Sequence, residues 1–232
     1  AVTAAATGDC QMLMKGHVHT DDFLRTVLRK EQGLRCPDVL MSHVFILEVR
    51  ALGRLLFVTD GAMNIAPTLE QKAQIIQNAA YLARCFGLEE PKVGAVAAVE
   101  LVNPAMPWTV EAAAFAAMDR RGQVPHCVVD GPFGLDNAVS REAAELKGVS
   151  GPVAGECDIL LVPDIEAGNI LAKTFSFLAG GRVAGVVVGA AVPIVLTSRA
   201  DSAEARLFSM ATAALMADLA RDTCLKIGKV HY

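Results

Sequence analysis

Short apolar runs rich in Val, Ile and Leu alternate with longer amphipathic segments along most of this chain. The short runs have the length and composition of strands, and they cover residues 11–14, 42–49, 55–59, 92–97, 126–129, 158–162, 182–188 and 194–196. The longer segments have helical periodicity, and they cover residues 20–30, 68–86, 109–119, 137–147, 166–178 and 203–221. This alternation predicts an α/β fold with a mainly parallel sheet.

Residues suited to helix ends and turns mark the boundaries of these segments. Thr20 begins a helix start signal and Gly33 lies after the expected helix end, as Gly87 does for the long helix 68–86. The dipeptide Gly131-Pro132 predicts a turn between a strand and the helix that follows.

The composition is that of a compact globular protein and argues against nucleic-acid and membrane partners. Of the 232 residues, 53% are hydrophobic and 20% are charged, and the formal net charge is −4. No basic run with interleaved aromatic residues is present, so we expect no nucleic-acid binding. The longest apolar run, 183–196, is about 14 residues long and contains Pro193, which is too short and too broken to span a bilayer. The six cysteines show no CxxC spacing, and we expect reduced thiols in a cytoplasmic protein.

The segment 192–202 carries the most informative pattern in the chain. A short apolar run stops and is followed by four residues that cap helices, namely Thr197, Ser198, Asp201 and Ser202. Arg199 lies where the positive end of the helix dipole disfavours a cation. A bound anion would explain the arginine, because backbone N–H groups, hydroxyls and a guanidinium would then converge on it. The alternative is an ordinary helix cap with a solvent-exposed arginine.

Four other junctions between a strand and a helix are polar and contain Gly or Pro. They are residues 15–20, 59–64, 130–137 and 163–169. In open α/β sheets, ligands bind beyond the carboxyl ends of the strands, so we expect these junctions to converge on one ligand site. Each candidate has a structural alternative: Lys15 as a solvated loop lysine, Asp60 as a turn former, Asp136 as a helix cap and Lys173 as a surface residue.

Motifs for other chemistries are missing or weak. His17 and His19, with Asp21 and Asp22 nearby, match no standard metal-ligand spacing, so we predict no metal site. The sequence contains no GxGxxG or Walker motif after a strand and no GxSxG motif, which argues against dinucleotide binding and α/β-hydrolase chemistry.

Five motifs run through the whole chain in a fixed order. They are Leu-Met-Lys-Gly at 13–16 with His19-Thr20, Thr-Asp-Gly-Ala-Met-Asn-Ile-Ala-Pro at 59–67, Asp-Gly-Pro at 130–132 with Asp-Asn-Ala-Val-Ser at 136–140, Pro-Asp-Ile-Glu-Ala-Gly-Asn at 163–169, and Pro-Ile-Val-Leu-Thr-Ser-Arg-Ala-Asp-Ser at 193–202. In this combination the chain resembles the phosphate acetyl/butyryltransferase family, and within it the phosphate butyryltransferase-like branch.

This resemblance implies reversible transfer of a short-chain acyl group between coenzyme A and inorganic phosphate, with no metal or redox cofactor. It implies direct attack of the CoA thiolate on the acyl phosphate, with Ser198 bonding the thiol or the developing oxyanion and Arg199 holding phosphate. A thiol needs a base or a positive field to supply thiolate at neutral pH. Ala205 occupies the position of the family's proposed aspartate base, so we favour Asp201 over Glu204.

The resemblance also implies a cleft between two α/β/α domains, with an isocitrate/isopropylmalate dehydrogenase-like architecture. We expect domain I to combine residues 1–66 with 197–232, and domain II to span 67–196. Family members carry a further βαβ unit before residue 13, so we expect an N-terminal part to be missing from this chain. The substrate-binding residues expected in the cleft are Lys15, Thr20, Asp60, Asn64, Asp130, Asp136, Asn169 and Lys173.

Further expectations follow from the family pattern, and two rival functions stay open. We expect a homodimer formed through domain II, with no nucleic-acid or membrane partner. The rivals are a degenerate CoA- or phosphate-binding module without turnover and a metal-dependent dehydrogenase of similar architecture. Acyl-chain length also stays open, because one methylene changes binding by only about 1–3 kcal/mol.

Overall fold

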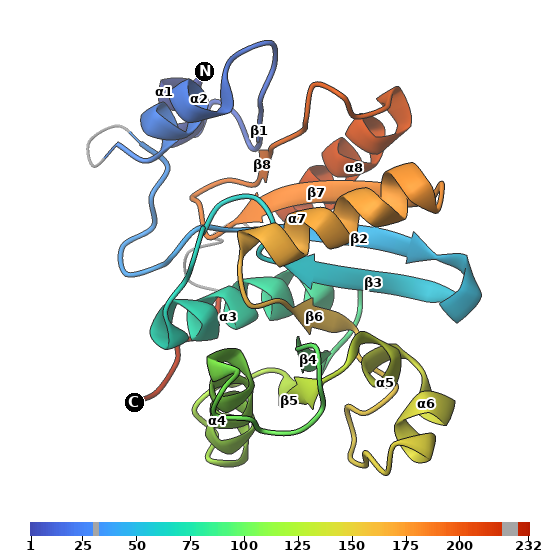
Figure 1. Ribbon diagram of the computed structural model, residues 1–232. Coiled ribbons are helices and arrows are strands. Elements are labelled where there is room, and N and C mark those ends of the chain that lie inside the picture. Colours follow the sequence, from blue (N-terminus) through green and yellow to red (C-terminus); the bar gives the residue numbers. More distant parts are fainter. Residues whose placement is uncertain (30–32, 220–226) are drawn as a thin grey trace.

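The computed structural model describes residues 1–29, 33–219 and 227–232. Within them, eight strands form one sheet in the order β1-β8-β7-β2-β3-β6-β4-β5 (Figure 1). The strands are β1 (Leu13–Met14), β2 (Ser42–Val49), β3 (Arg54–Thr59), β4 (Lys92–Val96), β5 (Val128–Phe133), β6 (Ile159–Leu161), β7 (Arg182–Val188) and β8 (Ile194–Val195). The predicted strands are therefore confirmed, with shifted ends.

The α/β fold is confirmed, and the sheet is mixed and mostly parallel. The pairs β1/β8, β3/β6, β4/β6 and β4/β5 are parallel, whereas β2/β3, β2/β7 and β7/β8 are antiparallel. A short 3-10 turn, η1 (Arg50–Leu52), and Gly53 at φ 63° join β2 to β3 as a hairpin. A connection this short forces antiparallel pairing, so the sheet departs from parallel at β2.

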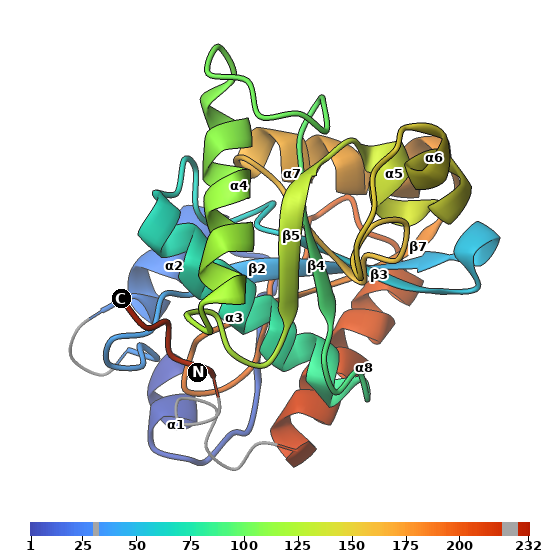
Figure 2. The same ribbon diagram turned by 90° about the horizontal axis from the view of Figure 1, so that it is seen from below.

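The helices cover both faces of this sheet, as Figure 2 shows for α7 on one side of β2 and β3 and for α3 and α8 on the other. The helices are α1 (Val2–Ala6), α2 (Thr20–Val27), α3 (Leu69–Cys85), α4 (Pro107–Arg120), α5 (Leu135–Val139), α6 (Arg141–Leu146), α7 (Ile165–Lys173), the π-helical turn η2 (Thr174–Leu178) and α8 (Ala203–Leu219). The expected ends of the helices 20–30 and 203–221 reach residues 30, 220 and 221, which lie outside the described residues.

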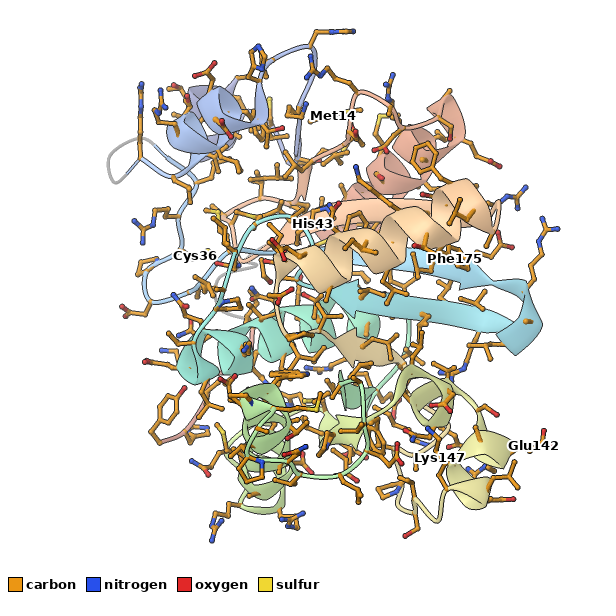
Figure 3. All side chains as sticks on the ribbon, viewed as in Figure 1. Met14, Cys36, His43, Glu142, Lys147 and Phe175 are labelled. Atoms are coloured by element: carbon orange, nitrogen blue, oxygen red, sulfur yellow. The ribbon has the colours of Figure 1, made fainter. Side chains whose placement is uncertain are left out.

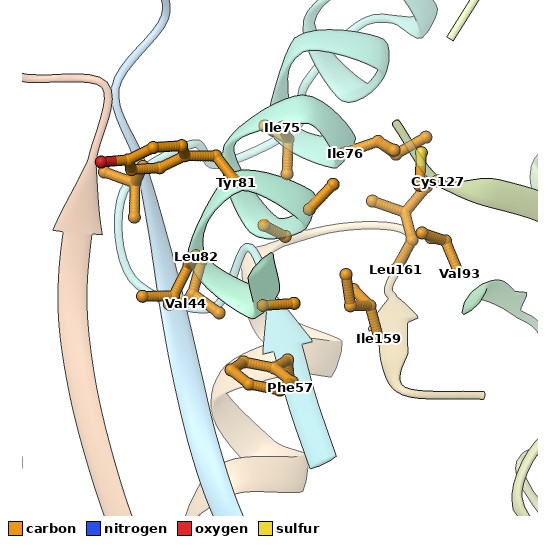
Figure 4. Packing of buried hydrophobic residues seen from close by; sticks show 14 of the residues in the cluster. Val44, Phe57, Ile75, Ile76, Tyr81, Leu82, Val93, Cys127, Ile159 and Leu161 are labelled. Carbon is orange, nitrogen blue, oxygen red and sulfur yellow. The ribbon is translucent and has the colours of Figure 1, made fainter. Parts of the chain in front are cut away.

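The core is split between the two faces of the sheet by the alternation of each strand. Phe57 packs with α3 and α4 in the larger core, shown in Figure 4, whereas its neighbours Leu56 and Val58 pack with α5, α6 and α7. A strand that is buried on both faces reads as a continuous apolar run, which is the pattern seen in β3.

Two helices differ from their predicted form. The segment 137–147 divides at Ser140, whose backbone is extended and whose Oγ accepts the Ala143 N–H at 3.2 Å. Serine side chains compete with helix bonding in this way, and here the serine begins a second helix. The segment 166–178 changes from α-helix to π-helix after Lys173.

The turn predicted at Gly131-Pro132 is wrong, because β5 continues through both residues with a cis peptide bond between them. The strand β5 lies at the edge of the sheet. An edge strand tolerates proline, since the missing N–H is not needed for pairing on the open side.

The expectation that all cysteines are reduced is wrong for Cys36, which is disulfide-bonded. Cys10, Cys85, Cys127 and Cys157 are free thiols, and Cys224 lies outside the described residues. Sequence spacing does not reveal such a bond, because tertiary folding brings the two sulfur atoms together. Among the described residues, no helix is both long enough and apolar enough to cross a bilayer.

Candidate functional site

Three cavities meet at the segment 197–199, directly after β8. Thr197 and Ser198 line all three. The large cavity, of about 390 Å³, lies among α7, β7 and the start of α8. The polar cavity, of about 290 Å³, lies between this segment and the start of α2, and a third cavity of about 110 Å³ adjoins Gly16. The structure thus brings the junctions 15–20 and 197–202 together, as the sequence predicted.

The segment 197–202 is held by its own side chains. Asp201 Oδ2 accepts the Ser198 N–H at 2.7 Å, and Ser198 Oγ accepts the Ala200 N–H at 3.3 Å. Ser202 Oγ accepts the Ala205 N–H at 3.0 Å, so Ser202 is the residue whose side chain caps α8. Asp201 instead closes the turn before the helix, which leaves its carboxylate in the wall of the large cavity.

Arg199 lies in the wall of both the polar cavity and the third cavity, with an exposed side chain. Its backbone carbonyl accepts a hydrogen bond of 3.1 Å from the guanidinium of Arg206 on α8. Arg206 also lines the third cavity. Sequence reasoning missed Arg206, which only the first turns of α8 bring back to the loop.

Lys15 is the most unusual residue in the polar cavity. Its side chain follows β1, is 5% exposed, and donates from Nζ to the Val18 carbonyl at 3.3 Å. No ion pair among the described residues involves Lys15. Burying an ammonium group against a single carbonyl is costly unless an anion completes its surroundings. The wall also contains Thr20 and Arg199. The carboxylate of Asp21 is the one acidic group that the described residues place in this wall.

Asn169 and Lys173 lie in the wall of the large cavity, on α7. The Asp164 side chain caps this helix by accepting the Ala167 N–H at 2.9 Å. Asn169 Nδ2 donates to the Gly61 carbonyl at 3.1 Å, which ties α7 to the loop after β3.

Asp60 and Asn64 organise that loop. The Asp60 carboxylate is 3% exposed and accepts the N–H groups of Ala62, Met63 and Asn64 at 2.9, 3.0 and 3.2 Å. It also accepts a bond of 2.6 Å from Asn64 Nδ2. Burial raises the pKa of Asp60 above its usual value. Hydrogen bonds from the backbones of Ala62, Met63 and His43 and from the Asn64 side chain offset part of this rise. The Asp60 carboxylate thereby holds Ala62, which lines the large cavity.

Asp130 and Asp136 lie near β5, at the opposite edge of the sheet from β1. Asp130 Oδ1 accepts the Gly131 N–H at 2.8 Å, and Asp136 Oδ2 pairs with Lys147 Nζ at 2.9 Å. Figure 3 labels Lys147 far from Met14, which lines the third cavity. The fold of this chain therefore does not bring these two aspartates to Ser198, and their substrate-binding role stays a prediction.

His43 was missed by sequence reasoning, although it interrupts the apolar run of β2. The side chain is 1% exposed and lines the large cavity (Figure 3). Burial lowers its pKa to about 4, so the ring is neutral at neutral pH. Its Nδ1 atom is buried without a hydrogen-bond partner. A polar residue within an apolar strand was the sequence signal that could have pointed to His43 in the cavity wall.

Glu204 and Asp201 both line the large cavity but differ in their partners. Glu204 Oε1 pairs with Arg182 Nε at 3.1 Å, and Arg182 also pairs with Glu48 at 3.3 Å. The described residues contain no group of three or more His, Cys, Asp or Glu side chains arranged to hold a metal ion.

Known proteins match most of this chain in sequence. The profile of the family described as "Phosphate acetyl/butaryl transferase" matches residues 1–214. The probable phosphate butyryltransferase of Bacillus subtilis (strain 168) is 54% identical over 213 residues, covering 92% of this chain and 71% of that protein. The phosphate acetyltransferase of Thermotoga maritima is 48% identical over 217 residues, covering 94% and 74%.

A solved structure shares the fold as well. The crystal structure of a branched-chain phosphotransacylase from Enterococcus faecalis V583 matches with a TM-score of 0.86 and 40% identity, covering 94% of this chain and 77% of that one. The match of the family profile includes every junction that lines the three cavities. The chain belongs to the phosphate acetyl/butyryl transferase family.

Proposed function

We propose that this chain is a phosphate acetyl/butyryltransferase that moves a short acyl group reversibly between coenzyme A and inorganic phosphate. The observation that carries the proposal is the buried ammonium of Lys15 beside Arg199 in a small polar cavity. Ser198 joins this cavity to a larger one. A phosphate site and a thioester site that meet at Ser198 are what acyl transfer between two substrates requires.

Phosphate binds in the polar cavity. Lys15 and Arg199 supply the positive charge that a phosphate dianion needs, and a guanidinium offers two parallel N–H donors to phosphate oxygens. Thr20 begins α2, whose N-cap residue, His19, makes no side-chain cap bond. The first N–H groups of that helix are therefore available as donors to an anion.

The acyl thioester binds in the large cavity, with its carbonyl carbon at Ser198. In one direction a phosphate oxygen forms a bond to this carbon, the carbon–sulfur bond breaks, and CoA leaves as thiolate. In reverse, the thiolate attacks the acyl phosphate and phosphate departs with the electron pair of the broken carbon–oxygen bond. The Ser198 hydroxyl donates to the thiolate or to the developing oxyanion, and Arg199 neutralises the departing phosphate.

Asp201 is the proton acceptor for the CoA thiol. Its Oδ2 is engaged by the Ser198 N–H, which fixes the carboxylate beside the serine. Glu204 is committed to Arg182, which favours the aspartate over the glutamate. Asp60 and Asn64 act by positioning the loop that contacts α7, and Asn169 and Lys173 contact the CoA moiety.

We infer that this site lies between the two proposed domains, which share one sheet. The large cavity is lined by Thr20, Ala62 and Ser198 from residues 1–66 and 197–232, and by Ala172 and Lys173 from residues 67–196. Walls drawn from both parts support the proposed boundaries. We further propose a homodimer, which analytical ultracentrifugation of the purified chain tests.

A phosphate-dependent CoA-release assay with acetyl-CoA and butyryl-CoA tests the function. The expected result is thiol release that requires phosphate and is reversed by adding acyl phosphate and CoA. Reduction of NAD without thiol release would support the dehydrogenase alternative instead. Tight CoA binding with no turnover would support a degenerate binding module.

A further inference from the structure

The large cavity has an open mouth and a closed end. Phe177, 64% exposed, and Lys173 and Arg182, also exposed, lie at the mouth. The buried residues His43 and Gly185 lie at the closed end with Phe45. In the sheet, β8 and β2 lie on opposite sides of β7, so the cavity extends across β7 from the Ser198 segment to the side chains of β2.

Two aromatic rings and a glycine build the closed end. The rings of His43 and Phe45 meet edge to face, with centroids 4.4 Å apart. Gly185 makes room for them, because a Cβ there would lie 2.8 Å from His43 Nε2 and 3.5 Å from Phe45 Cδ1. On its other side Phe45 has Gly61, where a Cβ would lie 2.7 Å from Phe45 Cε2. The position of the phenyl ring is therefore fixed by its neighbours.

The backbone N–H of Gly185 at this end already has a partner. The Gly185 N–H donates to Ser209 Oγ at 2.9 Å, and Ser209 Oγ donates to the Ala205 carbonyl at 2.8 Å. His43 is uncharged at neutral pH. Two rings without formal charge therefore line this end of the cavity, which suits a hydrocarbon group better than phosphate.

The order of groups in an acyl-CoA decides which part reaches this end. The nucleotide is bulky and charged, so it stays at the mouth near Lys173 and Arg182. The thioester carbon must lie at Ser198 to meet phosphate. Beyond that carbon only the alkyl chain remains, and it extends across β7 toward the rings.

We propose that His43, Phe45 and Gly185 form the end of the acyl-chain pocket and thereby set the length of acyl chain that the enzyme accepts. The inference rests on the proposed acyltransferase function. The relatives leave the preferred acyl-chain length open, since this chain is 54% identical to a probable butyryltransferase and 48% identical to an acetyltransferase.

Three variants of the full chain, assayed with acetyl-, butyryl- and hexanoyl-CoA, test this. Phe45→Ala lengthens the pocket and is expected to raise the hexanoyl-to-butyryl ratio of kcat/KM about tenfold or more. Gly185→Ala displaces the His43 ring into the pocket and is expected to lower the butyryl-to-acetyl ratio by about the same factor. Phe177→Ala is the matched control at the mouth, and it leaves both ratios unchanged.

Unchanged ratios in a folded Phe45→Ala protein would overturn the inference, as would an equal shift in Phe177→Ala. Circular dichroism and thermal melts establish which variants fold, and Phe45→Leu replaces Phe45→Ala if that variant does not fold. If the unmodified chain releases no CoA in response to phosphate, the proposed function fails. If the parent enzyme is phosphate-dependent but the kcat/KM ratios of the variants do not change, only the assignment of the acyl-chain pocket fails.

Discussion

The guanidinium of Arg206 donates a 3.1 Å hydrogen bond to the backbone carbonyl of Arg199. One arginine of α8 thus holds the loop that presents the other arginine to the polar cavity. Together with the Asp201 contact to the Ser198 N–H, this bond fixes both ends of the Ser198-Arg199 pair. Preorganised groups of this kind stabilise developing charge without reorganising during the reaction.

Replacing Arg199 with alanine removes the guanidinium that faces departing phosphate. We expect phosphate-dependent turnover to fall on the order of a hundredfold or more, because a preorganised charge in such a site contributes strongly to the transition state. Steady-state CoA release measures this. Arg25→Ala is the control, since Arg25 is an exposed arginine on α2 that pairs with Asp22. Near-normal phosphate dependence in Arg199→Ala would refute the assigned role.

Lys15→Met preserves much of the side-chain volume and removes the buried charge. We expect KM for phosphate to rise about tenfold or more while KM for acyl-CoA stays unchanged, because Lys15 lines the polar cavity and not the large one. Phosphate should also raise the Tm of the parent enzyme more than that of the variant, since a ligand stabilises the folded state it binds. Equal phosphate-induced shifts in Tm would contradict the phosphate site.

Asp201→Asn and Glu204→Gln form a matched pair that identifies the base. Each amide preserves shape and one acceptor oxygen but cannot take a proton at neutral pH. We expect Asp201→Asn to lower kcat about a hundredfold or more, as loss of a positioned base does. Glu204→Gln should change kcat little. The reverse order of effects would transfer the assignment to Glu204.

We expect the free energy of unfolding to fall in mild acid because of His43. Its pKa is lowered from 6.5 to about 4 by burial, so between these values the unfolded chain binds a proton that the folded chain excludes. This contribution to the free energy of unfolding is fully present above pH 6.5. It is lost as the pH falls toward 4, and the loss amounts to about 3 kcal/mol.

Urea unfolding of the parent and of His43→Leu from pH 7 to pH 4 measures this loss. Asp60 titrates in both proteins, so the difference in unfolding free energy isolates the histidine. That difference should move in favour of His43→Leu as the pH falls. A difference that does not change with pH would show that His43 is accessible to protons in the folded state.

Local chemistry made most elements predictable from sequence. Thr68 and Gln71 form a capping box at the start of α3, and the apolar run of β3 is continuous because both of its faces are buried. Such signals act within a few residues. They were insufficient at Ser140, where one side chain divides a helix, and at Gly131-Pro132, where an edge strand accommodates a cis proline.

Three features follow from neighbouring residues and can be read along the chain: the alternation of strands and helices, the polar segment 192–202 and the family-specific motifs. Tertiary structure decided which candidates meet. It brought Lys15 and Thr20 to Arg199 and assigned the α8 cap to Ser202. It separated Asp136 from them, because parallel strands far apart in the sheet order end at distant loops. It also placed His43 against Gly185, a contact made by pairing two strands remote in sequence.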